Sequence, residues 1–140
     1  MNVSECMTRE VRILSPQHSI QSAAQAMSEI DVGVLPVAEG DRLVGMVTDR
    51  DIAIRGVGRR CDPDTPVEEV MTKEIKYCFD DEDADEVLDN MADLQIRRLP
   101  VLSRDKRLVG IVSLGDLATR QHTPVDQALR DISTPAHALR

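Results

Sequence analysis

The sequence predicts an α+β fold built from two copies of one unit, each a strand, a helix, two further strands and a second helix. Three observations predict it: a repeat at a nearly constant offset, one helical apolar stripe in each copy, and the same short motif near the end of each copy. With 140 residues, 41% hydrophobic and 30% charged, the chain is also large and apolar enough to bury a core.

The repeat is visible in short identical segments. Two of them recur 64 residues later and a third recurs 65 residues later, so one residue has been added in the loop 102–106. These pairs are Met7-Thr8 with Met71-Thr72, Leu35-Pro36-Val37 with Leu99-Pro100-Val101, and 42–45 with 107–110. We therefore expect a first repeat over 1–60, a linker over 61–66, a second repeat over 67–121 and a C-terminal tail over 122–140.

Each repeat carries one amphipathic helix. Its apolar residues recur at spacings of three and four, which places them on one stripe facing a core. The stripe residues are Ile20, Ala23, Ala24, Met27 and Ile30 in the first repeat, and Ala84, Val87, Leu88, Met91 and Leu94 in the second. We expect Ser19 and either Asp80 or Asp81 to cap the two helices, since short oxygen-bearing side chains accept from the first free N–H groups.

Two strands and a short helix follow in each repeat. The runs 34–38 and 98–102 contain a proline, which favours a sheet edge or a strand start because proline cannot donate to a ladder. The runs 43–48 and 108–113 are typical of buried strands, and short helices are expected over 49–55 and 114–120. One repeat alone would bury little surface. We expect the two sheets to pack about a pseudo-twofold axis, leaving two clefts.

The remaining segments predict two further helices. Thr65-Pro66-Val67-Glu68 has the form of a helix start, with proline in the first turn. The tail predicts a short amphipathic helix from the helical spacing of Val125, Ala128, Leu129 and Ile132.

Composition excludes several classes of function. A net charge of −8 and only two aromatic residues, Tyr77 and Phe79, argue against a general nucleic-acid binder and against an aromatic cage. We find neither the roughly 18 consecutive apolar residues of a membrane span nor an apolar signal region at the N-terminus, and expect a cytoplasmic protein. The three cysteines lack metal spacing and are expected to be reduced thiols.

The motif near the end of each repeat reads glycine, two apolar residues, a hydroxyl residue, two variable residues and aspartate. It spans Gly45 to Asp51 and Gly110 to Asp116. A hydroxyl where a strand ends and a helix begins suits a phosphate or sugar oxygen, and a carboxylate one turn later can accept from ribose hydroxyls. The same spacing also fits a helix capping box. Both interpretations stay open at this point.

The ordered motifs resemble the CBS (cystathionine β-synthase) domain family over about residues 3–120. The resemblance rests on MT near each start, LPV in the middle, and the glycine–hydroxyl–aspartate motif at the end. Two copies resemble the tandem pair called a Bateman module. The stretch Val44 to Thr65 and the tail segment Ser133-Thr134-Pro135-Ala136 are similar to stand-alone bacterial proteins of the hypoxic response group.

The resemblance implies a sensor of adenosine ligands: AMP, ADP, ATP or NAD, and in some members S-adenosylmethionine. It implies that Thr48 with Asp51, and Ser113 with Asp116, hold ribose and phosphate. It further implies that the pocket lining is Thr8, Arg12, Val32, Gly33 and Val34 from the first repeat, and Thr72, Lys76, Ile96, Arg97 and Arg98 from the second.

The two arginines distinguish the repeats. Arg97 and Arg98 match a basic pair that grips phosphates in some relatives, whereas the first repeat has Gly33 and Val34 there. Arginine suits this task because its planar fork meets two oxygens at once. Consecutive strand residues point to opposite sides, so one of the two is expected to face solvent. We expect inequivalent clefts, one of which binds an anionic nucleotide more tightly.

The expected function is a non-catalytic regulatory module that binds an adenine nucleotide, forms a homodimer and acts on a separate, unidentified protein. The alternative is a nucleotide-free interaction homodimer in a stress response, with the hydroxyls and aspartates serving as helix caps. An enzyme is the weakest interpretation, because His18, His122 and His137 are scattered and form no catalytic arrangement. The acid cluster 80–85 lacks calcium-loop spacing and is expected to be a solvated helix start, with no metal bound.

Overall fold

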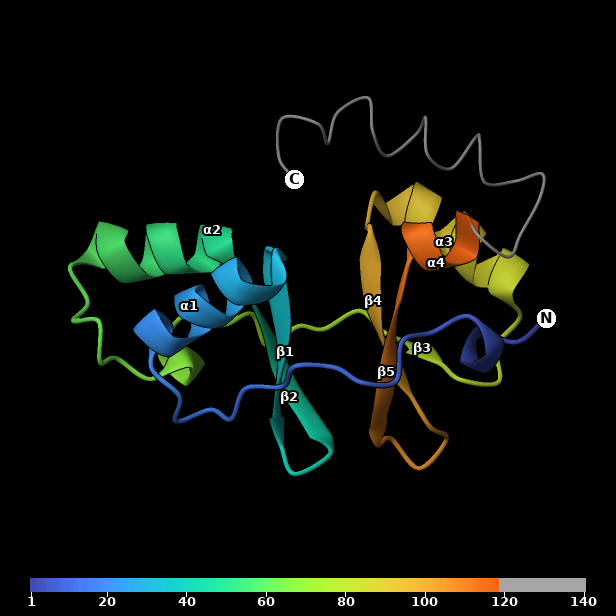
Figure 1. Cartoon of the computed structure of the whole chain (residues 1–140), viewed down its shortest axis with the longest axis horizontal. Helices are drawn as coiled ribbons and strands as arrows, with labels where there is room; N and C mark the ends of the chain where they lie inside the picture. Colours follow the sequence, from blue (N-terminus) through green and yellow to red (C-terminus); the bar gives the residue numbers. More distant parts are fainter. Residues whose placement is uncertain (119–140) are drawn as a thin grey trace. The chain divides into compact units, whose positions relative to one another are not determined.

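The computed structural model describes residues 1–118, which form two compact units (Figure 1). Residues 12–75 make one unit, here called the N-repeat unit. Residues 1–11 and 76–118 make the other, the C-repeat unit. The units therefore do not coincide with the repeats in the sequence. The first segment of each repeat, 1–11 or 67–75, belongs to the unit that is built around the other repeat.

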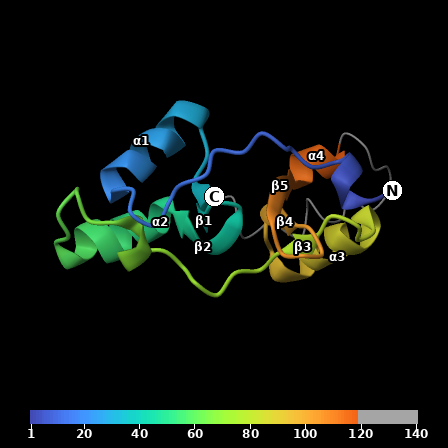
Figure 2. The ribbon, with the colours of Figure 1, turned by 90° about the horizontal axis from the view of Figure 1, so that it is seen from below.

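The N-repeat unit is a two-stranded antiparallel hairpin with its helices on one face (Figures 1 and 2). Strand β1 (Val34–Glu39) pairs with β2 (Arg42–Thr48), and Gly40 makes the turn with a φ of 63°. Positive φ is costly for residues with a Cβ, so glycine suits this turn. The helical segments are α1 (Ile20–Ile30), α2 (Asp49–Asp51), a π-helix (Ile52–Gly56) and the 3₁₀ turns Val57–Arg59 and Val67–Glu69.

The C-repeat unit contains a three-stranded sheet in the order β3-β4-β5, again with its helices on one face (Figures 1 and 2). Strand β3 (Cys78–Phe79) is parallel to β4 (Arg98–Leu102), which is antiparallel to β5 (Leu108–Ser113). The helices are α3 (Ala84–Leu94), α4 (Leu114–Ala118) and the 3₁₀ turn Val3–Glu5. The mixed α and β composition of both units agrees with the predicted fold class.

The opening strand of the repeat differs between the units. In the C-repeat unit it is β3, but in the N-repeat unit it shrinks to one parallel bridge between Leu14 and Val37. Leu14 donates to the Pro36 carbonyl at 3.0 Å and accepts from Ala38 at 2.8 Å. Beyond this bridge β1 has only β2 as a neighbour, so it is close to an edge strand, where a proline such as Pro36 is tolerated.

The apolar stripes are confirmed in their central residues and wrong at three positions. Ile20, Ala23 and Met27 are buried, as are Ala84, Val87, Leu88 and Met91. Ala24 is exposed and Ala26 is buried instead, so the stripe of α1 is rotated from the expected one. Ile30 and Leu94 are 43% and 47% exposed, because each ends its helix and the next residue turns away in the left-handed conformation.

One expected helix cap is confirmed and one is wrong. Ser19 caps α1 and accepts from Ser22 N–H at 3.0 Å. The cap of α3 is Asp83, not Asp80 or Asp81. Tertiary contacts explain this, because Asp80 is still bonded to the Leu102 carbonyl at 2.9 Å and the N-terminal segment occupies the next backbone groups. The first helical N–H, that of Ala84, donates to the Met1 carbonyl at 2.8 Å.

Four further helix predictions need correction or extend beyond the described residues. The helix expected over 49–55 is one α-helical turn that continues as a π-helix. The start expected at Thr65 is a 3₁₀ turn with Pro66 as its N-cap. Helix α4 is described only to Ala118, and the tail helix expected around Val125, Ala128, Leu129 and Ile132 lies beyond the described residues.

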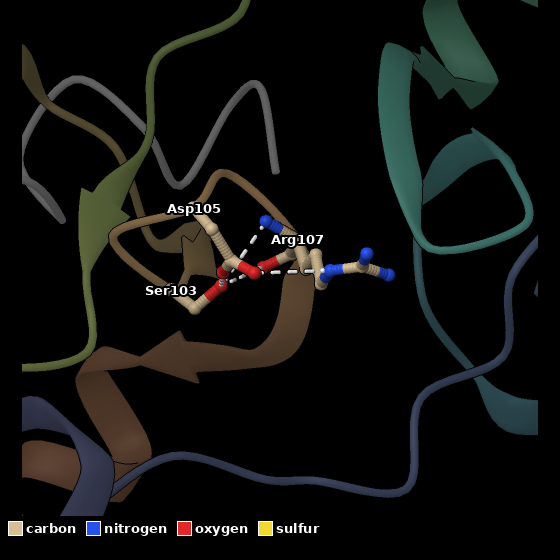
Figure 3. A network of polar contacts seen from close by, with 3 residues as sticks. All are labelled: Ser103, Asp105 and Arg107. Carbon is tan, nitrogen blue, oxygen red and sulfur yellow. Dashed lines mark hydrogen bonds and ion pairs between the residues drawn. The ribbon is translucent and has the colours of Figure 1, made fainter.

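The inserted residue of the second repeat lies in the turn between β4 and β5. Figure 3 shows Ser103, Asp105 and Arg107 closing this turn by hydrogen bonds. The Ser103 hydroxyl, and secondarily Arg107, lower the pKa of the Asp105 carboxyl. All of these bonds are local, so the longer turn is a closed structural loop.

The three cysteines are free thiols, and they differ in accessibility. Cys6 and Cys78 are buried, whereas Cys61 is half-buried. Burial, with smaller effects from Glu82 and Asp80, raises the pKa of the Cys78 thiol from 9.0 to about 12. A thiol held neutral in this way is a poor nucleophile.

We expect Cys78 to resist alkylation by iodoacetamide at pH 8 in the folded protein, while Cys61 reacts first. Because the folded-state pKa is raised, the contribution of Cys78 to stability is complete below pH 9 and is lost as the pH rises from 9 towards 12. Mass spectrometry of alkylated peptides checks the first expectation, and urea titrations at pH 8 and 10 check the second. Alkylation of Cys78 at the rate of Cys61 would contradict the first expectation.

No helix within residues 1–118 combines the length and the apolar character that a bilayer crossing requires.

Candidate functional site

The hydroxyl–aspartate pairs form capping boxes at the ends of β2 and β5. Thr48 N–H donates to Asp51 Oδ2 at 3.0 Å, and Asp51 N–H donates to Thr48 Oγ1 at 2.9 Å. Ser113 and Asp116 make the same two bonds, both at 3.0 Å. The capping interpretation is thus correct for both motifs. An ionised carboxylate offers about four acceptor positions, so the cap leaves capacity for further donors.

A second feature shared by the units ties each capping box to the start of the preceding strand. Asp49 N–H donates to the Gly33 carbonyl at 2.9 Å, and Leu114 N–H donates to the Arg97 carbonyl at 3.1 Å. The strand registers also place Val34 opposite Thr48, and Arg98 opposite Ser113. Each unit therefore brings together the hydroxyl, the aspartate and the two residues before the LPV segment.

Each Met-Thr segment pairs with the hydroxyl–aspartate motif of the other repeat. Thr72 pairs with Met46 through two backbone bonds of 2.8 and 2.9 Å, and its Oγ1 donates to Asp51 Oδ2 at 3.3 Å. Thr8 pairs with Ile111 through bonds of 2.8 and 3.0 Å. Thr72, from the start of the second repeat, thus lies at the first-repeat motif, and Thr8 lies on the strand of the second-repeat motif.

The motif glycines explain why these segments dock there. A Cβ on Gly45 would lie 2.5 Å from Met71 Sδ, and one on Gly110 would lie 2.7 Å from the Thr8 carbonyl oxygen and 2.8 Å from Met7 Sδ. Only glycine leaves space for this close approach. Met7 and Met71 were not among the expected site residues. The sequence did carry a signal for them, because the Met-Thr segment and the motif glycine both recur in the second repeat.

Sequence reasoning also missed Asp49. Its Oδ2 lies 2.9 Å from the position of a Cβ on Gly33, and its Oδ1 accepts from Arg50 N–H at 2.8 Å. The side chain is exposed and lies directly over Gly33. The corresponding residue of the C-repeat unit, Leu114, is buried in the core instead.

Other expected site residues lie in different surroundings. Arg12 is exposed and pairs with Glu29 of α1 at 3.0 Å. Lys76 is exposed on the segment before β3. Val32 and Ile96 are half-buried and pack against the two cores. Arg97 and Arg98 are both exposed.

A metal site was not expected, and the acid cluster has another structural role. Arg104 binds both carboxylate oxygens of Asp81 at 2.9 Å and lies over the Phe79 ring at 4.2 Å. The hydrogen bond from Arg104 lowers the pKa of Asp81. Over residues 1–118, no three His, Cys, Asp or Glu side chains gather in a way that could hold a metal ion.

The comparisons with known sequences agree with the repeat. The profile described as "CBS domain" matches twice, over residues 3–57 and 67–123. The CBS domain-containing protein YhcV of Bacillus subtilis is 42% identical over 134 residues, covering 94% of this chain and 95% of its own length. Hypoxic response protein 1 of Mycobacterium tuberculosis is 37% identical over 136 residues, covering 94% and 93%.

The comparisons with solved structures agree with the fold. A crystal structure of Hypoxic Response Protein I with two coordinated zinc ions has a TM-score of 0.76 at 37% identity, covering 86% of this chain and 98% of that one. The CBS domain pair of protein MJ0100, in complex with 5′-methylthioadenosine and S-adenosyl-L-methionine, has a TM-score of 0.71 at 28% identity, covering 85% and 94%. Two profile matches, relatives that align over nearly their whole length and the observed fold lead to one conclusion: this chain belongs to the CBS domain family and contains a tandem pair of CBS domains.

Proposed function

We propose that this protein is a regulatory module that binds an adenosine nucleotide, AMP, ADP, ATP or NAD, at the hydroxyl–aspartate sites of its two units. The observation that carries the proposal is the duplication of one local geometry. In both units a hydroxyl ends a strand, a carboxylate lies in the helical turn that follows, and a backbone bond ties this turn to the second residue before the LPV segment, Gly33 or Arg97. The ligands in the MJ0100 complex, which both contain adenosine, support the ligand class.

The side chains present suit the parts of a nucleotide. The carboxylates of Asp51 and Asp116 can accept from both hydroxyls of a ribose, and the Thr48 and Ser113 hydroxyls can donate to sugar or phosphate oxygens. In the C-repeat unit Arg97 and Arg98 add guanidinium groups, whose planar forks match phosphate oxygens. Because a ligand stabilises whichever state it binds better, occupancy of these sites can change the surface offered to a separate protein. We propose a homodimer as the acting form.

A thermal-shift series on the purified, ligand-stripped chain tests the proposal with AMP, ADP, ATP, NAD and S-adenosylmethionine. A ligand at one hundred times its Kd raises the free energy of unfolding by about 2.7 kcal/mol. For a chain of this size the melting temperature then rises by roughly 6–12 °C. We expect one of the nucleotides to give such a rise. The double variant Asp51→Asn/Asp116→Asn should lose it, because an amide retains one acceptor for the cap but not the carboxylate's pairing with two hydroxyls.

The matched control is Asp85→Asn, an exposed acid in the first turn of α3, which should keep the full shift. If no ligand of the series shifts the melting temperature, the nucleotide proposal fails. The second candidate, a nucleotide-free interaction homodimer, would then be favoured by the complete capping boxes at both motifs.

A further inference from the structure

The two hydroxyl–aspartate sites share a backbone geometry but differ in charge. In both, the residue after the hydroxyl donates to the residue before the first strand of the hairpin, at 2.9 Å in the N-repeat unit and 3.1 Å in the C-repeat unit. Any ligand held at the hydroxyl and the carboxylate therefore lies beside positions 33 and 34 in one unit, and beside 97 and 98 in the other. The side chains at these matched positions decide what can be attached to the ribose.

In the N-repeat unit the carboxylate of Asp49 lies over Gly33. Asp49 Oδ2 fills the space that a side chain at residue 33 would take, at 2.9 Å from that Cβ position. Its Oδ1 accepts the Arg50 N–H at 2.8 Å, so the carboxylate is held by its own turn. Gly33 and Asp49 thus depend on each other, because a larger residue at 33 would displace the carboxylate.

In the C-repeat unit the positions that match Gly33, Val34 and Asp49 carry two cations and no acid. Residues 97 and 98 are exposed arginines, and Leu114 replaces Asp49 and is buried in the core. Gly115 replaces Arg50. Over positions 33, 34 and 48–51 the N-repeat site holds two acids and one base. Over the matching positions 97, 98 and 113–116 the C-repeat site holds two bases and one acid. The two sites therefore differ by two units of charge, with opposite sign.

We infer that the sites select different ligand classes: the C-repeat site takes a nucleoside carrying phosphate, and the N-repeat site takes an adenosine whose 5′ group is uncharged or positive, with Asp49 as the residue that rejects phosphate. The inference rests on the proposed function, since it assigns a ligand class to each of the same two sites. Asp49 and Asp51 are two residues apart on one turn. A phosphate on a ribose held by Asp51 lies well within the Debye length, about 8–10 Å at 0.1–0.15 M salt, and is repelled by Asp49.

Calorimetric titrations with adenosine and AMP test the inference in the full chain carrying Asp116→Asn, which leaves the N-repeat site as the working one. We expect adenosine to bind more tightly than AMP. Adding Asp49→Asn should strengthen AMP binding about three- to tenfold at low salt, as expected for removing one repulsive charge near a solvent-exposed site, and leave adenosine within about twofold. The gain should shrink in 0.5 M salt, where exposed charges are screened.

Three further variants sharpen the result. Glu39→Gln removes the same charge at the opposite end of the β1–β2 hairpin, where Glu39 faces Arg42, and should change neither affinity. Arg50→Gln removes the neighbouring cation and should weaken AMP binding by no more than about tenfold, the converse of the Asp49→Asn effect. In the reciprocal background, Asp51→Asn, the change Arg97→Ala/Arg98→Ala should weaken AMP binding at least threefold and leave adenosine unchanged.

The outcomes separate the two proposals. If both ligands bind but Asp49→Asn leaves the AMP-to-adenosine affinity ratio unchanged, the inference fails and the proposed function stands. If Arg50→Gln weakens AMP binding by clearly more than about tenfold and leaves adenosine unchanged, Arg50 holds a phosphate directly at the N-repeat site and the inference is overturned. If neither ligand binds the unmutated chain, the inference fails, and if ADP, ATP, NAD and S-adenosylmethionine also fail to bind, the proposed function fails with it.

Discussion

Leu88→Ala is expected to lower the free energy of unfolding by about 2–5 kcal/mol, the range for truncating a fully buried leucine. Leu88 is completely buried on α3 and belongs to the core of the C-repeat unit, together with Val87 and Met91. The loss combines the transfer of the missing methyl groups from water with the cavity they leave, which close packing allows to collapse only in part. Urea titration followed by far-UV circular dichroism measures it.

The matched control is Leu94→Ala, the same chemical change six residues later on the same helix. Leu94 is 47% exposed, so its truncation removes much less buried surface and should cost about 1 kcal/mol or less. Both leucines fit the apolar spacing of the helix, so the pair separates periodicity from actual burial. Equal losses at the two positions would show that the end of α3 is covered in solution.

Gly110→Ala should destabilise the protein by about 2–3 kcal/mol, at the upper end of the usual cost of overpacking. The new Cβ would lie 2.7 Å from the Thr8 carbonyl oxygen, which is backbone. Thr8 is held to Ile111 by two backbone bonds of 2.8 and 3.0 Å, so relieving the clash requires loosening them. We expect partial release of the segment 1–11, seen as faster hydrogen exchange at Thr8 and Ile111.

Gly45→Ala is the internal comparison, because the same motif position meets a different obstacle in the N-repeat unit. There the nearest atoms all belong to the Met71 side chain, the closest at 2.5 Å. A thioether side chain can change rotamer, so we expect a smaller loss of about 1 kcal/mol. Gly115→Ala, whose Cβ finds only Ser113 Oγ at 3.5 Å, should be neutral or stabilising. A larger loss at Gly45 than at Gly110 would contradict the steric argument.

Much of the local structure follows from the sequence because its causes lie within a few residues. Helices α1 and α3 come from their apolar spacing, the hairpins from β-branched runs around short turns, and the Ser19 cap from one side chain. The duplicated hydroxyl–aspartate motif was likewise visible as a pattern, and both of its capping boxes formed. Only neighbouring residues are needed to form these features.

Tertiary contacts decided where the local rules stopped. Asp83 rather than Asp80 caps α3, because the N-terminal segment and β4 already bond the backbone before it. Ile30 and Leu94 continue the apolar spacing but are exposed at the ends of their helices. The opening strand of the first repeat is reduced to the single bridge at Leu14.

The sequence by itself determined that this protein is two copies of one α+β unit, each with a nucleoside-compatible hydroxyl and carboxylate at a strand end. Only the tertiary structure decided which segments complete each site: Thr72 joins Asp51, Thr8 joins the strand before Ser113, and Asp49 lies over Gly33. The physical reason is range. Periodicity and capping act over one or two turns, whereas the docking of a methionine–threonine segment against a glycine is set by which backbone surface it reaches in space, and no local pattern encodes that choice.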